Sequence, residues 1–199
     1  AKHIRAQDQA IVVEGYMDFL ALYQAGIKNV VAPLGTSFTH EHALLLKRFT
    51  SQVVLLFDGD LAGQNAMERS LPLLLSAGLI PRGIILPDDL DPDDFVKQNG
   101  NALLKEKIAT SMELFFLVLE RWMKGFKGSA GEKITLLDRI NPLFQSITDL
   151  RLKDLYLKEL AERMDVEPRW LRNALGQNPP HKKRIALNTS LSLKPSLCL

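Results

Sequence analysis

The sequence has almost no cysteine, and its single thiol, Cys198, leaves no partner for an internal disulfide. This composition is typical of a reducing compartment, and we expect a cytoplasmic protein. The longest apolar runs, near Leu71–Leu75 and Phe115–Leu119, fall well short of the roughly 18 residues that a membrane span requires. The first residues contain no signal-peptide hydrophobic stretch. Disulfide scaffolds, membrane proteins and structural cysteine-zinc sites are therefore excluded at this stage.

The net charge of +2 is small, but its distribution is uneven. Residues 1–100 contain 8 Lys and Arg against 12 Asp and Glu, a net charge of −4. Residues 101–199 contain 17 against 11, a net charge of +6. An acidic first half followed by a basic second half indicates two functional regions.

The first hundred residues alternate between short apolar runs and helical patterns. The runs are rich in Val, Ile and Leu without polar alternation, which is typical of strands buried on both faces of a parallel sheet. Repeated strand–helix–strand units predict a Rossmann-like α/β domain over residues 1–100. Pro72 should end or kink the third helix near Ser70. The predicted strands are Ala10–Val13, Asn29–Ala32, Gln52–Phe57 and Arg82–Leu86, and the predicted helices are Met17–Ala25, Thr39–Phe49 and Ala62–Ser76.

From Asn101 onward the strand signals stop, and apolar residues follow helical spacing. We expect an all-α helical subdomain over residues 101–176 and a linker or tail over residues 177–199. The glycine-rich stretch Gly125–Gly131 is predicted to be a flexible connector. The predicted helices are Glu113–Lys124, Glu132–Ile140, Leu150–Met164 and Trp170–Leu175.

Acidic residues follow three of the predicted strands. Because the carboxyl ends of parallel strands meet at one edge of a sheet, where open α/β sheets bind ligands, we expect these side chains to lie together. Gly15 follows Glu14, and Gly59 separates Asp58 from Asp60. These glycines leave room for close approach by a ligand. Oxygen ligands without His or Cys favour Mg²⁺ or Mn²⁺ over zinc, and Mg²⁺ commonly bridges carboxylates to phosphates. The pattern therefore favours phosphoryl transfer at a metal site built from Glu14, Asp58, Asp60 and the acidic run over residues 88–94.

Helix capping is the alternative explanation for part of this pattern. Asp91 precedes a proline and can be an N-cap with proline at the first helical position, and Asp60 can cap the third helix. Asp18 is interpreted as a solvated or capping residue of the first helix. Capping does not explain Glu14 at a strand end, so the coincidence of three strand ends favours a ligand site.

Four ordered motifs resemble the Toprim catalytic domain of primases, topoisomerases, some nucleases and recombination proteins. They are Glu14-Gly15-Tyr16-Met17-Asp18, Leu34-Gly35-Thr36-Ser37, Asp58-Gly59-Asp60 with Ala62-Gly63, and Asp91-Pro92-Asp93. The first two are similar to bacterial DnaG-type DNA primases, and Asp154–Ala161 resembles the helical subdomain that follows Toprim in that family. The resemblance covers about residues 11–175. It implies a Toprim fold with a mostly parallel sheet and flanking helices, followed by an all-α subdomain.

The resemblance also implies an activity, namely template-directed synthesis of short RNA primers on single-stranded DNA from ribonucleoside triphosphates. In that family the acids at these positions hold divalent metal, and the glutamate takes part in metal binding or acid–base work. Two or three ions would hold the nucleotide while the nascent primer's 3′-hydroxyl attacks its α-phosphate and pyrophosphate leaves. The expected catalytic residues are Glu14, Asp58 and Asp60. The expected ligands of Mg²⁺ or Mn²⁺ are these three residues together with Asp91 and Asp93. The nucleotide side of the pocket is assigned to Gly35, Thr36 and Ser37.

A complete primase of this family also carries a zinc-binding module, a basic subdomain and a C-terminal region that contacts the replicative helicase. The chain has no Cys/His cluster, so we expect no zinc here. We expect the helicase contact to lie largely outside the chain, unless part of it is in Ile185–Leu199, and we expect no membrane contact. The chain alone should bind metal but synthesise primers weakly or not at all.

Two other functions fit the same residues. A Toprim-type nuclease or topoisomerase-related subunit would use the same metals and cleave labelled single strands. A non-enzymatic metal- or nucleotide-binding module would bind its ligand without turnover. Basic residues of the second half can contact phosphates, but solvated helix faces are the commoner explanation, so no nucleic-acid contact is assigned to Lys124, Lys127, Lys133, Arg151, Lys153 or Arg169.

Overall fold

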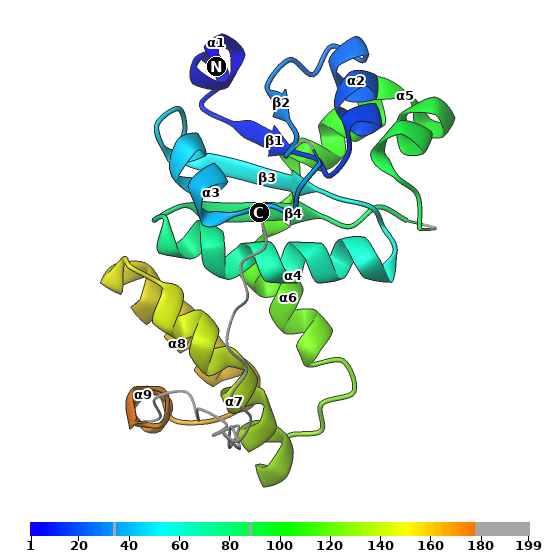
Figure 1. Ribbon diagram of the computed structural model, residues 1–199. Coiled ribbons are helices and arrows are strands. Elements are labelled where there is room, and N and C mark those ends of the chain that lie inside the picture. The colour runs from blue at the N-terminus through cyan, green and yellow to red at the C-terminus, as the bar shows by residue number, and fades with distance from the viewer. Residues whose placement is uncertain (34, 88, 178–199) are drawn as a thin grey trace, which may run out of the picture.

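The computed structural model describes residues 1–33, 35–87 and 89–177 of the chain (Figure 1). Leu34 of the second motif, and the expected linker or tail from residue 178 onward, lie outside the described residues. Within the described ranges no helix combines the length and the apolar character that crossing a bilayer requires.

Five strands form one sheet in the order β2-β1-β3-β4-β5. Four of them are parallel, as the sequence predicted, and β4 begins two residues before its expected start. The short strand β5 pairs antiparallel with β4, so the expectation that strands stop after Asn101 is wrong. Two residues are too few to show a periodic pattern, and only their pairing with β4 reveals them. The strands are β1 (Ala10–Val12), β2 (Val30–Val31), β3 (Gln52–Leu56), β4 (Ile80–Ile84) and β5 (Met112–Glu113).

Helices cover both faces of the sheet, and alternate strand residues point into two apolar cores. Val12 and Leu55 point into one core, whereas Ile11 and Val54 point into the other. The helices α2 (Tyr16–Gln24) and α5 (Pro92–Ala109) pack together over the second core (Figure 1). The first core is covered by α1 (Lys2–Gln7), α3 (His40–Lys47), α4 (Leu61–Ser76) and α6 (Leu114–Trp122). The predicted α/β fold class with flanking helices is confirmed.

The helix α4 passes through Pro72 and ends only at Ser76. A proline inside a helix removes one hydrogen bond and costs about 3 kcal/mol. Leu71, Leu74 and Leu75 are buried on either side of it, and burying each leucine contributes about 2 kcal/mol. Packing therefore outweighs the local cost, and the helix reaches Ser76, as the helical pattern predicted, instead of ending near Ser70.

The remaining helices, α7 (Ala130–Ser146), α8 (Leu150–Met164) and α9 (Pro168–Gln177), form the lower part of the molecule in Figure 1. Ser129 and Glu132 form a capping box that starts α7 after the glycine-containing connector. The first core continues into this helical region, where the buried Phe144 and Tyr156 both pack against Phe115 of α6. The apolar interior is therefore continuous from the sheet to the helices. The division of the chain into domains at residues 100 and 176 stays a prediction.

Candidate active site

The candidate site lies where the strand order reverses. The chain leaves β1 for β2 on one side and then returns to β3 on the other side of β1. In an open parallel sheet, the crevice at the carboxyl ends of two such strands is the usual ligand site. Glu14 follows β1 and Asp58 follows β3, so both lie at this crevice.

Two glycines let neighbouring segments pack directly on the end of β3. A Cβ atom at Gly59 would lie 2.5 Å from the carbonyl oxygen of Leu86, and one at Gly63 would lie 2.3 Å from that of Asp58. The Gly59 amide also donates to the carbonyl of Leu90 at 3.0 Å. The room beside Gly59 is therefore filled by the chain itself, not by a ligand as the sequence suggested. This close packing brings the segment that leads into Asp91 to the same edge.

A sixth acid, Asp18, belongs to this edge. It is only 8% exposed, and its carboxylate accepts a hydrogen bond from the Gly15 amide at 3.1 Å in the first turn of α2. The capping interpretation is confirmed, but the expectation of a solvated side chain is wrong. Burial raises the pKa of Asp18, the Gly15 hydrogen bond opposes this, and the negative charge of Asp91 raises the pKa further. Its position four residues after Glu14, in the first helical turn at a strand end, is the sequence signal that points to it.

At this edge, the negative charges of Glu14 and Asp58 are the least compensated by hydrogen bonds or cations of the chain. Burial, followed by the charges of Asp18, Asp91 and Asp60, raises the pKa of Asp58 from its ordinary value of 3.8 to about 6. Burial and then the charge of Asp58 raise the pKa of Glu14, and the backbone amide of Asp58 partly offsets this. The Oε1 atom of Glu14 is buried and has no hydrogen-bond partner among the described residues. A buried carboxylate oxygen without a partner costs free energy unless a cation or donor reaches it.

The other three predicted acids have partners within the chain. The Oδ1 atom of Asp60 accepts from the Gly63 amide at 2.8 Å as the N-cap of α4. Asp91 is likewise the N-cap of α5, so the capping explanation is confirmed for both residues. Asp93 pairs with the ammonium group of Lys97 at 2.7 Å. Nowhere in the described ranges do three or more His, Cys, Asp or Glu side chains lie close enough to hold a metal ion by themselves.

The donor chemistry at this edge fits a hard divalent cation. Every candidate ligand is a carboxylate oxygen, and the buried Oε1 atom of Glu14 has no partner in the part of the chain that the structure describes. Magnesium is usually held by one or two carboxylates with waters and substrate phosphates. Glu14 and Asp58 provide that number, while the acids around them raise the local negative potential.

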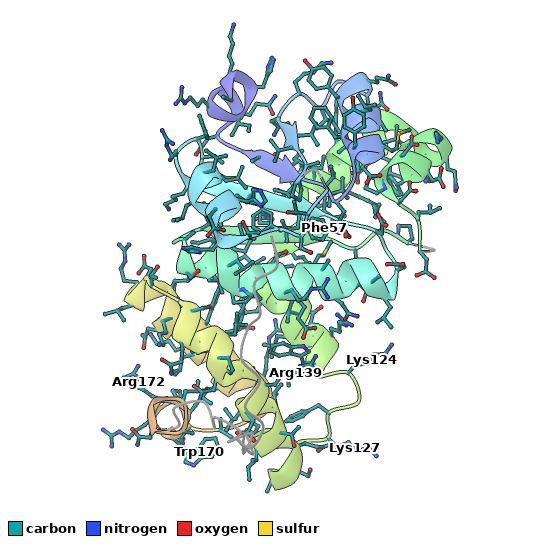
Figure 2. The ribbon with its side chains drawn as sticks, viewed as in Figure 1. Phe57, Lys124, Lys127, Arg139, Trp170 and Arg172 are labelled. Atoms are coloured by element: carbon teal, nitrogen blue, oxygen red, sulfur yellow. The ribbon has the colours of Figure 1, made fainter. Side chains whose placement is uncertain are left out.

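A cavity of about 330 Å³ opens beside Glu14. Gly35, Thr36 and Ser37, the residues predicted for the nucleotide side, line it together with this glutamate. Phe57 at the end of β3 forms part of its wall, and Figure 2 shows this side chain between the sheet and α4. Sequence reasoning missed Arg69, which lines the same cavity from α4, because no local pattern shows which way this exposed residue points.

The basic residues of the second half do not gather at this cavity. Figure 2 shows Lys124 and Lys127 on the connector after α6, well away from Phe57. The Lys133 ammonium group donates to the carbonyl of Asp165 at 3.1 Å. Arg151 pairs with the neighbouring Asp149 at 2.8 Å.

Comparison with known proteins gives two family matches. The profile of the Toprim-like family matches residues 11–96, and that of the DnaB-helicase binding domain of primase matches residues 119–169. The second match disagrees with the expectation that the helicase contact lies largely outside the chain.

The relatives and solved structures agree with these families. The DNA primase of Aquifex aeolicus is 49% identical over 114 residues, which are 57% of this chain and 23% of that protein. A DNA primase domain from Pseudomonas aeruginosa superimposes with a TM-score of 0.76 at 32% identity, over 85% of this chain and 54% of that one. A DnaG primase catalytic domain bound to single-stranded DNA gives a TM-score of 0.73 at 32% identity, over 82% and 53% of the two chains. The chain spans about a quarter of the length of the curated relatives that it matches.

Proposed function

Because the chain belongs to the bacterial DnaG-type DNA primases, we propose that it carries the nucleotidyl-transfer site of such an enzyme. The reaction is the synthesis of short RNA primers on single-stranded DNA from ribonucleoside triphosphates. The observation that supports it most directly is the buried Oε1 atom of Glu14, which lies beside Asp58 at the crevice between β1 and β3 and has no partner among the residues described. We propose the bacterial cytoplasm as the compartment of this activity, and the similarity to bacterial DNA primases supports this.

The ligands proposed for two or three Mg²⁺ or Mn²⁺ ions are Glu14 and Asp58 first, with Asp60, Asp91 and Asp93 around them. When bound, these ions supply stabilisation of the charge that develops on the transferred phosphoryl group. The chain itself orients these ligands. Asp60 and Asp91 are held at the edge because each is the N-cap of a helix, Asp60 of α4 and Asp91 of α5. With a pKa of about 6, Asp58 is mostly ionised above pH 7 and can act as a ligand there.

Thr36 and Ser37 are proposed to face the bound nucleotide, because both line the cavity that Glu14 lines. Gly35 has a φ of +71°, in the left-handed region, which lets the loop turn there without strain. A larger side chain at this position would be strained whatever the space around it.

We also propose two macromolecular partners. The profile over residues 119–169 is described as a DnaB-helicase binding domain, so the replicative helicase is the proposed partner of the helical region. The single-stranded DNA template is the second partner, and the structural similarity to a DNA-bound primase domain supports it. The nascent RNA primer would remain paired with that template.

The test uses Glu14→Gln and Asp58→Asn in the full-length protein. Primer synthesis is measured with labelled ribonucleotides on a single-stranded template, and Mn²⁺ affinity is measured by electron paramagnetic resonance. Each substitution removes a charge where the mechanism needs it, so synthesis should fall about 100-fold or more. The exposed Asp138 is the matched control, and Asp138→Asn should leave both readouts unchanged.

Unchanged primer synthesis by both variants would refute the proposed function. Metal-dependent cleavage of labelled single strands, lost in Glu14→Gln and without primer formation, would assign a nuclease instead. Tight nucleotide binding without any turnover in the full-length protein would assign a binding module. The 199-residue chain by itself is expected to bind metal but to make few or no primers.

A further inference from the structure

One guanidinium group beside the candidate site has no role in the mechanism above. Arg69 on α4 lines the cavity of about 330 Å³ together with Glu14, Thr36 and Ser37. It is an exposed residue, and within the described ranges its guanidinium group forms no ion pair or hydrogen bond. It does not pair with Glu14 across the cavity, so its charge is available to a ligand.

The neighbouring acid cannot neutralise this charge, because it is engaged on another side of α4. Glu68 pairs with Arg121 of α6 at 3.2 Å and with Arg139 of α7 at 2.8 Å. Arg139 also lies over the ring of Trp122, at 4.4 Å from its centroid. Consecutive helical residues point about 100° apart. Anchoring Glu68 to the helical region therefore fixes the rotation of α4 and leaves Arg69 at the cavity.

Part of the cavity lining carries groups that recognise phosphate. An arginine binds phosphate oxygens with two parallel hydrogen bonds, and the Ser37 hydroxyl group can donate to the same oxygens. The Thr36 hydroxyl group donates to the Ser37 carbonyl at 2.8 Å and would rotate away from it to reach a phosphate. The carboxylates at the strand ends would repel a polyanion, so a cation a short way along the cavity complements them. The volume lies at the lower end of small-ligand sites and suits part of a nucleotide.

We propose that Arg69 binds a phosphate group of the incoming ribonucleoside triphosphate, with Thr36 and Ser37 completing the subsite. This inference rests on the proposed function, since it takes the acids at the strand ends to be the site of nucleotidyl transfer. A phosphodiester of the template strand carries the same chemistry. The small cavity beside Glu14 favours the free nucleotide.

The experiment compares Arg69→Gln and Arg69→Lys with the unchanged full-length protein. The matched control is Arg48→Gln, since Arg48 is an exposed arginine at the C-cap of α3. Three quantities are measured: KM and kcat for ATP with MgCl₂ in primer synthesis, the salt dependence of single-stranded DNA affinity, and the affinity for Mn²⁺ alone. Arg69→Gln should raise KM for ATP at least 10-fold with a smaller change in kcat. Arg69→Lys should recover part of the loss, and Arg48→Gln should change none of the three.

Two results would overturn the inference. If Arg69→Gln leaves KM for ATP unchanged but lowers the salt slope of DNA binding by about one, the phosphate belongs to the template. If neither quantity changes, the residue binds no phosphate. Mn²⁺ affinity should stay the same in both Arg69 variants, which shows that the site still folds. Failure of the proposed function would instead appear as unimpaired synthesis in Glu14→Gln, so the two failures are distinguishable.

Discussion

Replacing Asp58 by Asn should make the metal-free protein more stable while removing much of its response to divalent cations. Asp58 is surrounded by Asp18, Asp91 and Asp60, and burial and these charges raise its pKa to about 6. The folded state therefore holds the Asp58 proton more tightly than the unfolded state does, between about pH 4 and pH 6. Where the folded state binds more protons, the free energy of unfolding falls as pH rises. Ionised Asp58 thus destabilises the fold fully above about pH 6 and not at all below about pH 4.

The size of this effect follows from the pKa difference between the two states. At about 1.4 kcal/mol per pKa unit, a rise from 3.8 to about 6 corresponds to about 3 kcal/mol. Asp58 is partly exposed, and solvent screening reduces this to about 1 kcal/mol. For a chain of this length, that difference raises Tm by about 3 °C.

The measurement is thermal unfolding followed by circular dichroism at pH 7.5, first in EDTA and then in MgCl₂ or MnCl₂. In EDTA, Asp58→Asn should melt about 3 °C above the unchanged protein, and the difference should vanish near pH 4. A cation at a 100-fold excess over its Kd should stabilise the unchanged protein by about 2.7 kcal/mol, and most of this gain should be lost in the variant. Asp138→Asn serves as the control and should show neither effect. A variant that melts lower than the unchanged protein in EDTA at pH 7.5 would refute the electrostatic reasoning.

Two further predictions concern packing. Gly63→Ala should lower the free energy of unfolding in urea by about 2 kcal/mol and weaken Mn²⁺ binding, because the new Cβ would lie 2.3 Å from the Asp58 carbonyl oxygen. The control Gly131→Ala has nothing within 4 Å of its Cβ and should stabilise the protein slightly. Equal effects of the two substitutions would contradict the steric argument. Tyr156→Phe should cost about 1.5 kcal/mol, because the buried hydroxyl donates to the Glu113 carboxylate at 2.8 Å. The exposed Tyr23→Phe is its control, and an unchanged unfolding midpoint for Tyr156→Phe would show that this hydrogen bond contributes nothing.

Features encoded by a short stretch of sequence were predictable. The apolar runs that form β1 and β3 end directly before Glu14 and Asp58, and parallel strands bring those ends together wherever the helices pack. The caps at Asp60 and Asp91 are equally local, since each depends on an amide three residues ahead. These features needed no knowledge of the tertiary structure.

Features set by distant contacts were not predictable. The helical pattern predicted α4 as far as Ser76, but that Pro72 does not end the helix depends on burial of its leucines against the sheet. The burial of Asp18 depends on the packing of α2 against α5. The placement of Arg69 depends on the pairing of Glu68 with two arginines more than fifty residues away in the chain. In each case the deciding partner is far away in the sequence.

The helix α4 joins the two regions through adjacent residues that point in different directions, Glu68 to the helices and Arg69 to the cavity. Losing one residue between the cap at Asp60 and Glu68 would turn every later side chain by about 100° about the helix axis. The ion pairs of Glu68 with the helices and the position of Arg69 at the cavity would then be lost together. Length differences among chains that share this fold should therefore be confined to their loops and leave the spacing from Asp60 to Arg69 constant.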